Sequence, residues 1–294
     1  MSIEASGETP PATMAASTPP VTLVIVPTRG WPSLRLGDLW EYRELLYFLT
    51  WRDVKVRYKQ TVLGVAWAVL QPLLLMLIFV LLLGRVGGLS KEVPSEVPYS
   101  VFVFSGLVPW TLFAAGITAA AAVLVANTNL VTKVYFPRLV LPISSAGSFL
   151  IDLLLSLGVL LCLMAWYGLY PSWRIVALPA LILLTLVASI GVGTWLAALN
   201  ARYRDVRYIV PFLTQIWLFL SPVVYTSTQV PEPWRVVYNL NPMVAVIEGF
   251  RWALFDLPWT LGWLPALSVV VSFAILVSGA FFFRRIERTF ADEL

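Results

Sequence analysis

Long apolar stretches separated by short polar segments dominate the hydrophobic pattern of this chain. The first, Val62–Leu83, contains 22 uncharged residues. At ~1.5 Å per residue, a helix of this length rises roughly 33 Å and crosses the ~30 Å hydrocarbon core of a bilayer. Pro72 predicts a kink in it, because proline removes a backbone hydrogen bond. Five similar stretches follow: Tyr99–Ala126, Leu139–Tyr167, Ile175–Asn200, Ile209–Tyr225 and Trp259–Phe283. We therefore predict an all-α polytopic membrane protein with six transmembrane helices.

Basic residues are distributed unevenly between the two sides of these six spans. The segments before Val62, at Asn127–Arg138, at Ala201–Tyr208 and after Phe283 fall on one side, and they carry fifteen of the 20 lysines and arginines. The other side carries five. Because basic loops are retained in the cytoplasm, we expect both termini to be cytoplasmic.

The N-terminal part of the chain precedes the spans and divides into two regions. Residues 1–33 are mostly Pro, Ala, Ser and Thr, and we interpret them as a disordered cytoplasmic tail. They do not resemble a signal peptide, because no basic start precedes a sufficiently long apolar core. Residues 34–60 follow as a separate helix, and residues 61–294 form the six-span domain.

Helical periodicity over residues 34–60 predicts one amphipathic helix. Asp38 and Glu41 have the spacing of a helix cap and its partner. Large apolar residues recur at helical spacing on one face: Trp40, Tyr47, Trp51, Val54 and Tyr58. Because this helix is also rich in Arg and Lys, we expect it to lie in the membrane interface, with a solvated surface helix as the alternative.

The polar segment between spans five and six, Thr226–Pro258, is unusually long. It contains an apolar stretch, Met243–Phe255, that is too short to span and is interrupted by Glu248 and Arg251. We predict external re-entrant helices here, since irregular backbone at membrane depth must be buried in protein or line a cavity. A plain external loop is the alternative.

Composition excludes most soluble and catalytic classes. The chain is 59% hydrophobic and 12% charged, with a mean hydropathy of +0.83. It has no histidine, one cysteine (Cys162) and no lysine that follows a glycine, so histidine-based catalysis, an internal disulfide and a P-loop are absent. We predict no catalytic residue, metal or cofactor site. Asp152, the one acid well inside a span, remains open between a structural hydrogen bond and an ion site.

Several motifs resemble one family along most of the chain. The run from Thr50 to Trp67, closing on Gln71 and Pro72, resembles the first segment of ABC-2 permeases that export lipid-linked polysaccharides, such as O-antigen, capsule and teichoic acid. Further similar motifs follow in the same order, over about Leu34 to Arg288: Lys133–Arg138 with Leu141–Pro142, Asn200–Arg207, Ser221–Tyr225 and Asn239–Met243.

The resemblance implies a homodimer of permeases that carries two copies of a separate ATPase subunit, in which ATP and magnesium bind. It implies that an undecaprenyl-linked polysaccharide passes between the protomers across the bacterial cytoplasmic (inner) membrane. No nucleic acid is expected as a partner. The missing P-loop agrees with a motor on another chain.

Carried over by position, the family motifs assign roles to four groups of residues. The substrate entrance, for the pyrophosphate and lipid, comprises Arg52, Lys55, Arg57, Lys59, Arg202, Arg204 and Arg207. The residues assigned to coupling with the ATPase are Trp51, Asp53, Lys133, Phe136, Pro137 and Arg138. Channel-lining aromatics would be Trp67, Trp110, Phe212, Trp217 and Phe219, and an external gate would comprise Glu248 and Arg251. The alternative for the basic residues is that they only set the orientation in the membrane. The alternative for the aromatic residues is packing between helices or a position at the membrane–water interface.

Two other functions compete with glycan export. An ABC-2 exporter of small lipids or drugs would share the six-span plan. A membrane glycosyltransferase or acyltransferase would need a catalytic acid or histidine pair at the membrane face; the sequence has no histidine, and Glu248 with Asp256 is a poor candidate.

Overall fold

The computed structural model describes residues 36–59, 64–91, 93–203, 205–257, 259 and 262–287. By backbone contacts the chain divides into residues 1–30 and 31–294, and every described residue belongs to the second unit. The predicted tail, residues 1–33, therefore lies outside the described residues.

The described residues form helices and connecting turns, without a strand among them. The α-helices are α1 (Leu36–Glu41), α2 (Arg43–Lys59), α3 (Gly64–Phe79), α4 (Tyr99–Ala126), α5 (Thr128–Lys133), α6 (Val140–Gly147), α7 (Leu150–Trp166), α8 (Leu178–Arg202), α9 (Val206–Phe219), α10 (Glu232–Tyr238), α11 (Pro242–Phe255) and α12 (Pro265–Ile286). A π-helical segment, η1 (Val80–Val86), extends α3, and three short 3-10 helices are η2 (Leu89–Lys91), η3 (Trp173–Ala177) and η4 (Ser227–Gln229). The all-α prediction is confirmed for this part of the chain.

Within the described ranges, five helical segments are long and apolar enough to cross a membrane: Ala66–Val86, Tyr99–Ala126, Val140–Trp166, Trp173–Arg202 and Pro265–Ile286. The expected fifth span corresponds to α9, whose 14 residues rise only ~21 Å. A helix of this length is shorter than the ~30 Å hydrocarbon core. The described residues thus contain five candidate membrane spans, and the sixth span stays a prediction.

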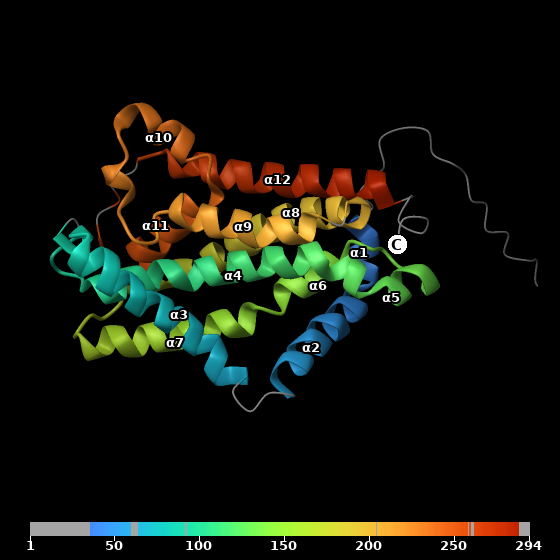
Figure 1. Ribbon diagram of the computed structural model, residues 1–294, viewed down its shortest axis with the longest axis horizontal. Helices are drawn as coiled ribbons and strands as arrows, with labels where there is room; N and C mark the ends of the chain where they lie inside the picture. The colour runs from blue at the N-terminus through green and yellow to red at the C-terminus, as the bar shows by residue number, and fades with distance from the viewer. Residues whose placement is uncertain are drawn as a thin grey trace, which may run out of the picture. The chain divides into compact units, whose positions relative to one another are not determined.

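Helix α4 lies at the centre of the bundle and packs against α3, α6, α7, α8, α9 and α11. Figure 1 shows the axes of α4, α8, α9 and α12 roughly parallel to one another, without regard to chain direction. Small residues permit the close contacts: a Cβ on Gly193 of α8 would lie 2.5 Å from the Cβ of Ala120 on α4. Such contacts are typical of membrane helices, where dispersion and hydrogen bonds replace the hydrophobic effect between helices.

The structure divides two segments that the sequence predicts as single helices. The third span breaks at Ser148 and Phe149, between α6 and α7. Of the predicted helix 34–60, the described residues 36–59 form α1 and α2, separated at Tyr42. The expected aromatic face on this segment is also divided: Val54 is buried, while Trp51 is exposed. The reason is that α2 packs one side against α6 and turns another apolar side outward.

The long polar segment between α9 and α12 contains two short helices, α10 and α11. Helix α11 begins at a well-formed cap, in which the Asn241 side chain accepts a hydrogen bond from the Met243 amide at 3.0 Å and Pro242 takes the first helical position. It packs against α4, α8 and α12, so most of its side chains are buried. This burial explains how a short helix with two charged residues is held within the bundle.

Candidate functional site

Helix α2 presents basic and aromatic side chains along a shallow groove. Figure 1 shows α2 inclined to the bundle helices rather than aligned with them. The groove has a volume of about 370 Å³, and its floor mixes apolar and positively charged groups. The Lys55 ammonium lies 5.5 Å from the centre of the Trp51 ring, within the range of a cation–π contact. The lining residues are Phe48, Trp51, Arg52, Lys55, Val56 and Lys59.

Arg57, on the other side of α2, attaches this helix to α7. Its Nη1 lies 2.8 Å from Oδ2 of Asp152, and its Nη2 donates to the Ser148 hydroxyl at 3.2 Å. The guanidinium also lies 3.6 Å from the centre of the Phe149 ring. Arg57 is therefore occupied in a contact between helices and does not line the groove with the other predicted entrance residues.

Tyr58 completes this contact by donating a hydrogen bond from its hydroxyl to Oδ1 of Asp152. Burial raises the pKa of Tyr58, and the hydrogen bond to Asp152 raises it further, so the hydroxyl stays protonated and remains a donor. Asp152 therefore receives a cation and a hydroxyl partner, both from α2, which favours a structural role over an ion site. The sequence placed Tyr58 only on an aromatic face, and this role was not predicted.

Arg52 links α2 to the segment that follows α4. Its Nη2 lies 2.8 Å from Oδ1 of Asp53 and donates to Oδ1 of Asn127 at 3.1 Å. Asn127 in turn donates from its side-chain amide to the carbonyl of Val123 at 2.9 Å, which fixes the end of α4. These contacts connect Asp53 of the predicted coupling group, through Arg52, to the residue that precedes α5.

The remaining coupling residues lie around the α5–α6 connection. Phe136 is buried in a cluster with Leu49 of α2 and Phe283 of α12, so this connection holds three parts of the chain together. Arg138 donates from Nη1 to the Glu287 carbonyl at 2.8 Å, and its amide donates to the Glu287 side chain at 3.3 Å. Burial raises the pKa of Glu287 despite the nearby arginines.

A short exposed strip interrupts this packed region. Lys133 and the two residues after it are exposed, and Tyr135 has 94% of its surface accessible. Pro137 then turns the chain back toward α6 and is only partly exposed. A fully exposed tyrosine beside buried anchors is a frequent feature of binding surfaces, because its ring supplies contact area with little loss of side-chain entropy. Tyr135 was not singled out from the sequence.

The basic residues near the α8–α9 turn contact neighbouring aromatics. Arg202 lies 5.5 Å from the Tyr203 ring centre, and Arg207 donates to the Tyr208 hydroxyl at 2.8 Å. Arg204, the third predicted residue of this group, lies outside the described residues. Figure 1 shows this turn at the same end of the bundle as α5 and the C-terminal end of α12.

The predicted channel aromatics occupy two different environments. Trp110 is buried in the core against Phe113, and the Trp217 ring lies 5.1 Å edge-on from the same phenylalanine. Trp67 on α3 and Phe212 on α9 are exposed. Phe219 is also exposed and makes an edge contact with Phe79 at 6.3 Å. The structure therefore keeps Trp67, Phe212 and Phe219 on open faces and places Trp110 inside the helix packing.

The predicted external gate residues face inward. Arg251 is 1% exposed, and its guanidinium donates to the carbonyls of Val223 at 2.8 Å and Tyr225 at 3.2 Å. Glu248 lies 3.6 Å from Arg251 and accepts a hydrogen bond from the Ser227 hydroxyl at 2.7 Å. A buried arginine requires such partners, because an uncompensated buried charge is strongly destabilising.

This arrangement fixes the segment after α9 against α4. The Arg251 guanidinium lies 3.5 Å from the centre of the Phe102 ring on α4. At Gly106, a Cβ would lie 3.1 Å from the backbone of Val223, so the lack of a side chain permits this close approach. Glu248 and Arg251 thus hold α11, α4 and the chain after α9 in one position.

Comparison with known proteins gives consistent matches along the chain. The profile of the family described as ABC-2 type transporter matches residues 44–255. An O-antigen export system permease protein RfbA from Myxococcus xanthus is 36% identical over 263 residues, which are 87% of this chain and 98% of that protein. A permease of the same name from Klebsiella pneumoniae is 26% identical over 255 residues, 85% of this chain and 95% of that protein.

A more distant relative has a related name. The polysialic acid transport protein KpsM from Escherichia coli is 26% identical over 209 residues, which are 69% of this chain and 78% of that protein. The family profile covers well over half of the chain, and the helical spans agree with a membrane protein of this kind. The chain described here therefore belongs to the ABC-2 type transporter family.

Proposed function

We propose that this chain is the permease subunit of an ATP-driven ABC exporter that moves an undecaprenyl-linked, O-antigen-like polysaccharide across the bacterial cytoplasmic membrane. The observation that carries the proposal is the similarity to the Myxococcus xanthus O-antigen export permease, at 36% identity over 98% of that protein. ATP and magnesium bind in a separate ATPase subunit, since this chain has no lysine in a P-loop context.

In the proposed membrane arrangement, α9 is the sixth span and both termini are cytoplasmic. The excess of basic residues at one end of the spans supports this orientation. Because α9 is short, the bilayer around it is thinned or the adjoining turns lie at membrane depth, where surrounding protein satisfies their backbone groups. At one end of α9, Arg251 provides hydrogen bonds of this kind to the backbone carbonyls of Val223 and Tyr225.

The groove on α2 is the proposed substrate entrance. Arg52, Lys55 and Lys59 carry positive charge beside Phe48 and Trp51, which suits a pyrophosphate joined to an apolar lipid. Arg202 and Arg207 add basic charge at the α8–α9 turn. Arg57 has a different role in this proposal: it positions α2 through Asp152 and does not bind substrate.

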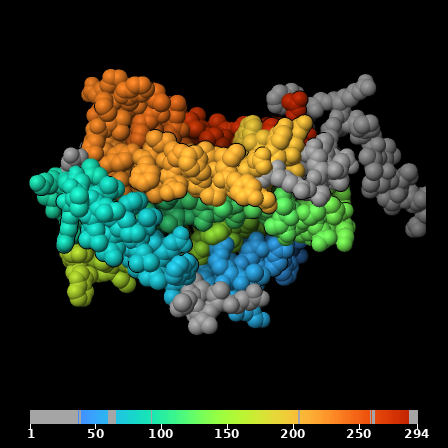
Figure 2. Space-filling view, viewed as in Figure 1, coloured from blue at the N-terminus to red at the C-terminus, as the bar shows by residue number. Residues whose placement is uncertain are grey.

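The glycan passes between two copies of the chain. Helices α3 and α9 leave apolar faces uncovered, and Figure 2 shows α3 in teal and α9 in gold on the same face of the molecule. Trp67, Phe212 and Phe219 lie on these open faces. Flat aromatic rings contact the apolar faces of sugars without a fixed hydrogen-bond pattern, which suits a polymer that must move. Two copies of the separate ATPase subunit dock near Trp51, Lys133 and Tyr135 of the permeases.

The competing functions make different use of the same residues. A transferase would need both carboxylates of the candidate pair to be available, but the Glu248 side chain is only 17% exposed and is held by Arg251 and Ser227. An exporter of small lipids or drugs fits the same fold. The names of the relatives, which refer to O-antigen and polysialic acid, favour a polysaccharide over a small molecule.

Deletion of the gene tests the proposal directly. We expect lipid-linked glycan to accumulate on the cytoplasmic side, surface glycan to disappear, and an ATPase to co-purify with the tagged protein. Complementation with the full chain provides the control. Normal surface glycan in the deletion strain, with no ATPase bound, would refute the proposed function. Altered drug efflux with normal surface glycan would instead support the small-molecule alternative.

A further inference from the structure

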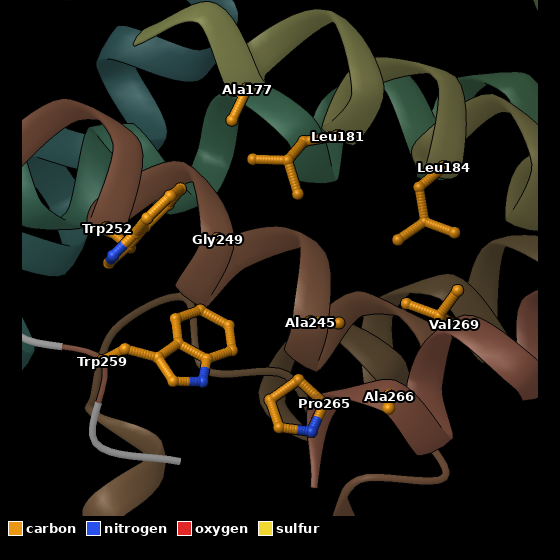
Figure 3. Close-up of a pocket in the computed structure, with 10 residues that line it drawn as sticks. All are labelled: Ala177, Leu181, Leu184, Ala245, Gly249, Trp252, Trp259, Pro265, Ala266 and Val269. Atoms are coloured by element: carbon orange, nitrogen blue, oxygen red, sulfur yellow. The ribbon is translucent and has the colours of Figure 1, made fainter. Parts of the chain in front are cut away.

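A cavity of about 400 Å³ lies where α8, α11 and α12 meet. Figure 3 shows the side chains that surround it, with Leu181 and Leu184 on α8 facing Val269 on α12 and Trp252 on α11. Its volume falls within the ~300–1,000 Å³ of typical small-molecule sites. Trp259 closes one side, and the described residues that line the cavity include no charged side chain. An apolar chain is therefore the kind of group that this space accepts.

Small residues of α11 line the side of the cavity that faces α8. They are Ala245 and Gly249, and Gly249 lets the Leu181 side chain approach α11 closely, because a Cβ there would lie 2.7 Å from it. The lining extends along the η3–α8 segment from Ala177 to Leu184, which corresponds to ~10 Å of helical rise. That depth suits part of an extended acyl chain entering along the helix axis.

A charged pair stands next to the cavity. Nη1 of Arg174 lies 2.8 Å from Oδ1 of Asp256 and donates to the carbonyl of Leu257 at 3.2 Å. The guanidinium lies 5.2 Å from the ring centre of Trp252, which lines the cavity. The Arg174 and Asp256 side chains are 27% and 57% exposed, so both remain accessible to a ligand. The rim therefore offers one positive and one negative group side by side.

Tryptophans mark the level of this rim. Trp173, next to Arg174, is 79% exposed, and Trp259 and Trp263 are also exposed. Tryptophan side chains concentrate at the headgroup level of a bilayer, where the indole is half apolar and half polar. The charged pair then lies at the headgroups, and the apolar cavity lies beside it on the hydrocarbon side.

We infer that this cavity binds a phospholipid with a zwitterionic headgroup of the phosphatidylethanolamine type. The lipid phosphate contacts Arg174, the ammonium contacts Asp256, and one acyl chain enters the cavity between α8 and α12. Asp256 discriminates against anionic headgroups, which lack a cation to pair with its carboxylate. The inference depends on the membrane placement of α8 and α12 and not on export of a glycan.

Two cavity-filling variants test the acyl-chain part of the site. Ala177→Trp and Ala266→Trp place an indole in the cavity from different helical segments, and neither residue belongs to the buried core. Val270→Trp is the matched control, because Val270 lies on α12, is 64% exposed and does not line the cavity. The purified full chain in detergent is titrated with phosphatidylethanolamine, and bound lipid is counted by native mass spectrometry.

We expect each filling variant to weaken phosphatidylethanolamine binding about tenfold, and the control to bind as the wild type does. Equal binding by Ala266→Trp, Ala177→Trp and Val270→Trp would overturn the site. Lipid binding is measured without transport. A negative lipid-binding result therefore does not argue against the proposed export function, and a negative result in the gene-deletion test does not argue against the lipid site.

The headgroup assignment has its own test. Asp256 has a positive φ of 56°, a conformation that asparagine tolerates well, so Asp256→Asn removes the charge with little backbone strain. We expect the wild type to bind phosphatidylethanolamine more tightly than phosphatidylglycerol. In Asp256→Asn, the ratio of these two affinities should fall about fivefold. An unchanged preference in the variant, or none in the wild type, would overturn the assignment.

Discussion

The guanidinium of Arg57 lies 2.8 Å from the carboxylate of Asp152 and joins residues that are 95 positions apart in the chain. This contact holds a basic helix, α2, against a predicted membrane span, α7. It also separates Arg57 from the other basic residues in the C-terminal half of α2. Arg57 anchors the helix, whereas Arg52, Lys55 and Lys59 line the exposed groove.

The first prediction concerns this anchor. Arg57→Gln and Asp152→Asn should each lower the stability of the purified protein, and the double variant should lose less than the sum. Because both side chains are partly exposed, we expect a coupling energy of about 1 kcal/mol. Thermal unfolding in detergent measures it through a double-mutant cycle. Strictly additive losses would show that the pair contributes nothing.

The second prediction concerns the groove. Combined Arg52→Gln, Lys55→Gln and Lys59→Gln changes should impair glycan export while membrane insertion is maintained. Each removed charge should cost about 1 kcal/mol of attraction to an anionic lipid headgroup. Surface glycan and protein in the membrane fraction are measured together. Arg85→Gln with Lys91→Gln, in the segment after α3, is the control. Parallel loss of export and insertion would assign the groove to membrane orientation.

The third prediction concerns the exposed strip after α5. Tyr135→Ala should leave stability unchanged, because the side chain is 94% exposed. Binding of the ATPase subunit should weaken by about 2 kcal/mol, or roughly thirtyfold, if Tyr135 is an anchor of that interface. The matched control is Tyr170→Ala, which removes a tyrosine that is 78% exposed in the connection after α7. Co-purification that is equal in both variants would exclude Tyr135 from the interface.

The fourth prediction concerns Arg251. Arg251→Gln should lower the free energy of unfolding by about 3–5 kcal/mol, because it removes a buried charge whose partners are Glu248 and backbone carbonyls. Arg251→Lys keeps the charge but replaces the two guanidinium nitrogens that donate to the Val223 and Tyr225 carbonyls by a single ammonium, so it should give an intermediate loss. A Gln variant that unfolds at the wild-type temperature would contradict this role.

The fifth prediction compares two glycines in helices. A Cβ on Gly191 of α8 would lie 2.8 Å from the backbone nitrogen of Leu276 on α12, so Gly191→Ala should destabilise the protein by about 1–3 kcal/mol. On α7, a Cβ on Gly158 would meet no neighbouring atom of the described residues within 4 Å, and Gly158→Ala should be neutral or stabilising by up to ~1 kcal/mol. Melting temperatures compare them. The same loss in both variants would disprove close packing of α8 on α12.

Much of the fold follows from the sequence, because membrane helices are specified by local composition. The predicted span Tyr99–Ala126 coincides with α4, and the other apolar stretches overlap the observed helices. A run of apolar residues is sufficient because every backbone group in lipid must bond within its own helix. The position of helix breaks was less predictable: Ser148 and Phe149 interrupt an apolar run that has no proline at that point.

The sequence by itself determined the helical class, the number of apolar stretches, the charge asymmetry and the motifs that resemble polysaccharide exporters. Only the tertiary structure decided what each charged group contacts. Arg57 pairs with Asp152, Arg251 is buried among carbonyls, and Arg174 stands with Asp256 beside an apolar cavity. The physical reason is that hydropathy is a property of neighbours in sequence, whereas an ion pair depends on which helices pack together.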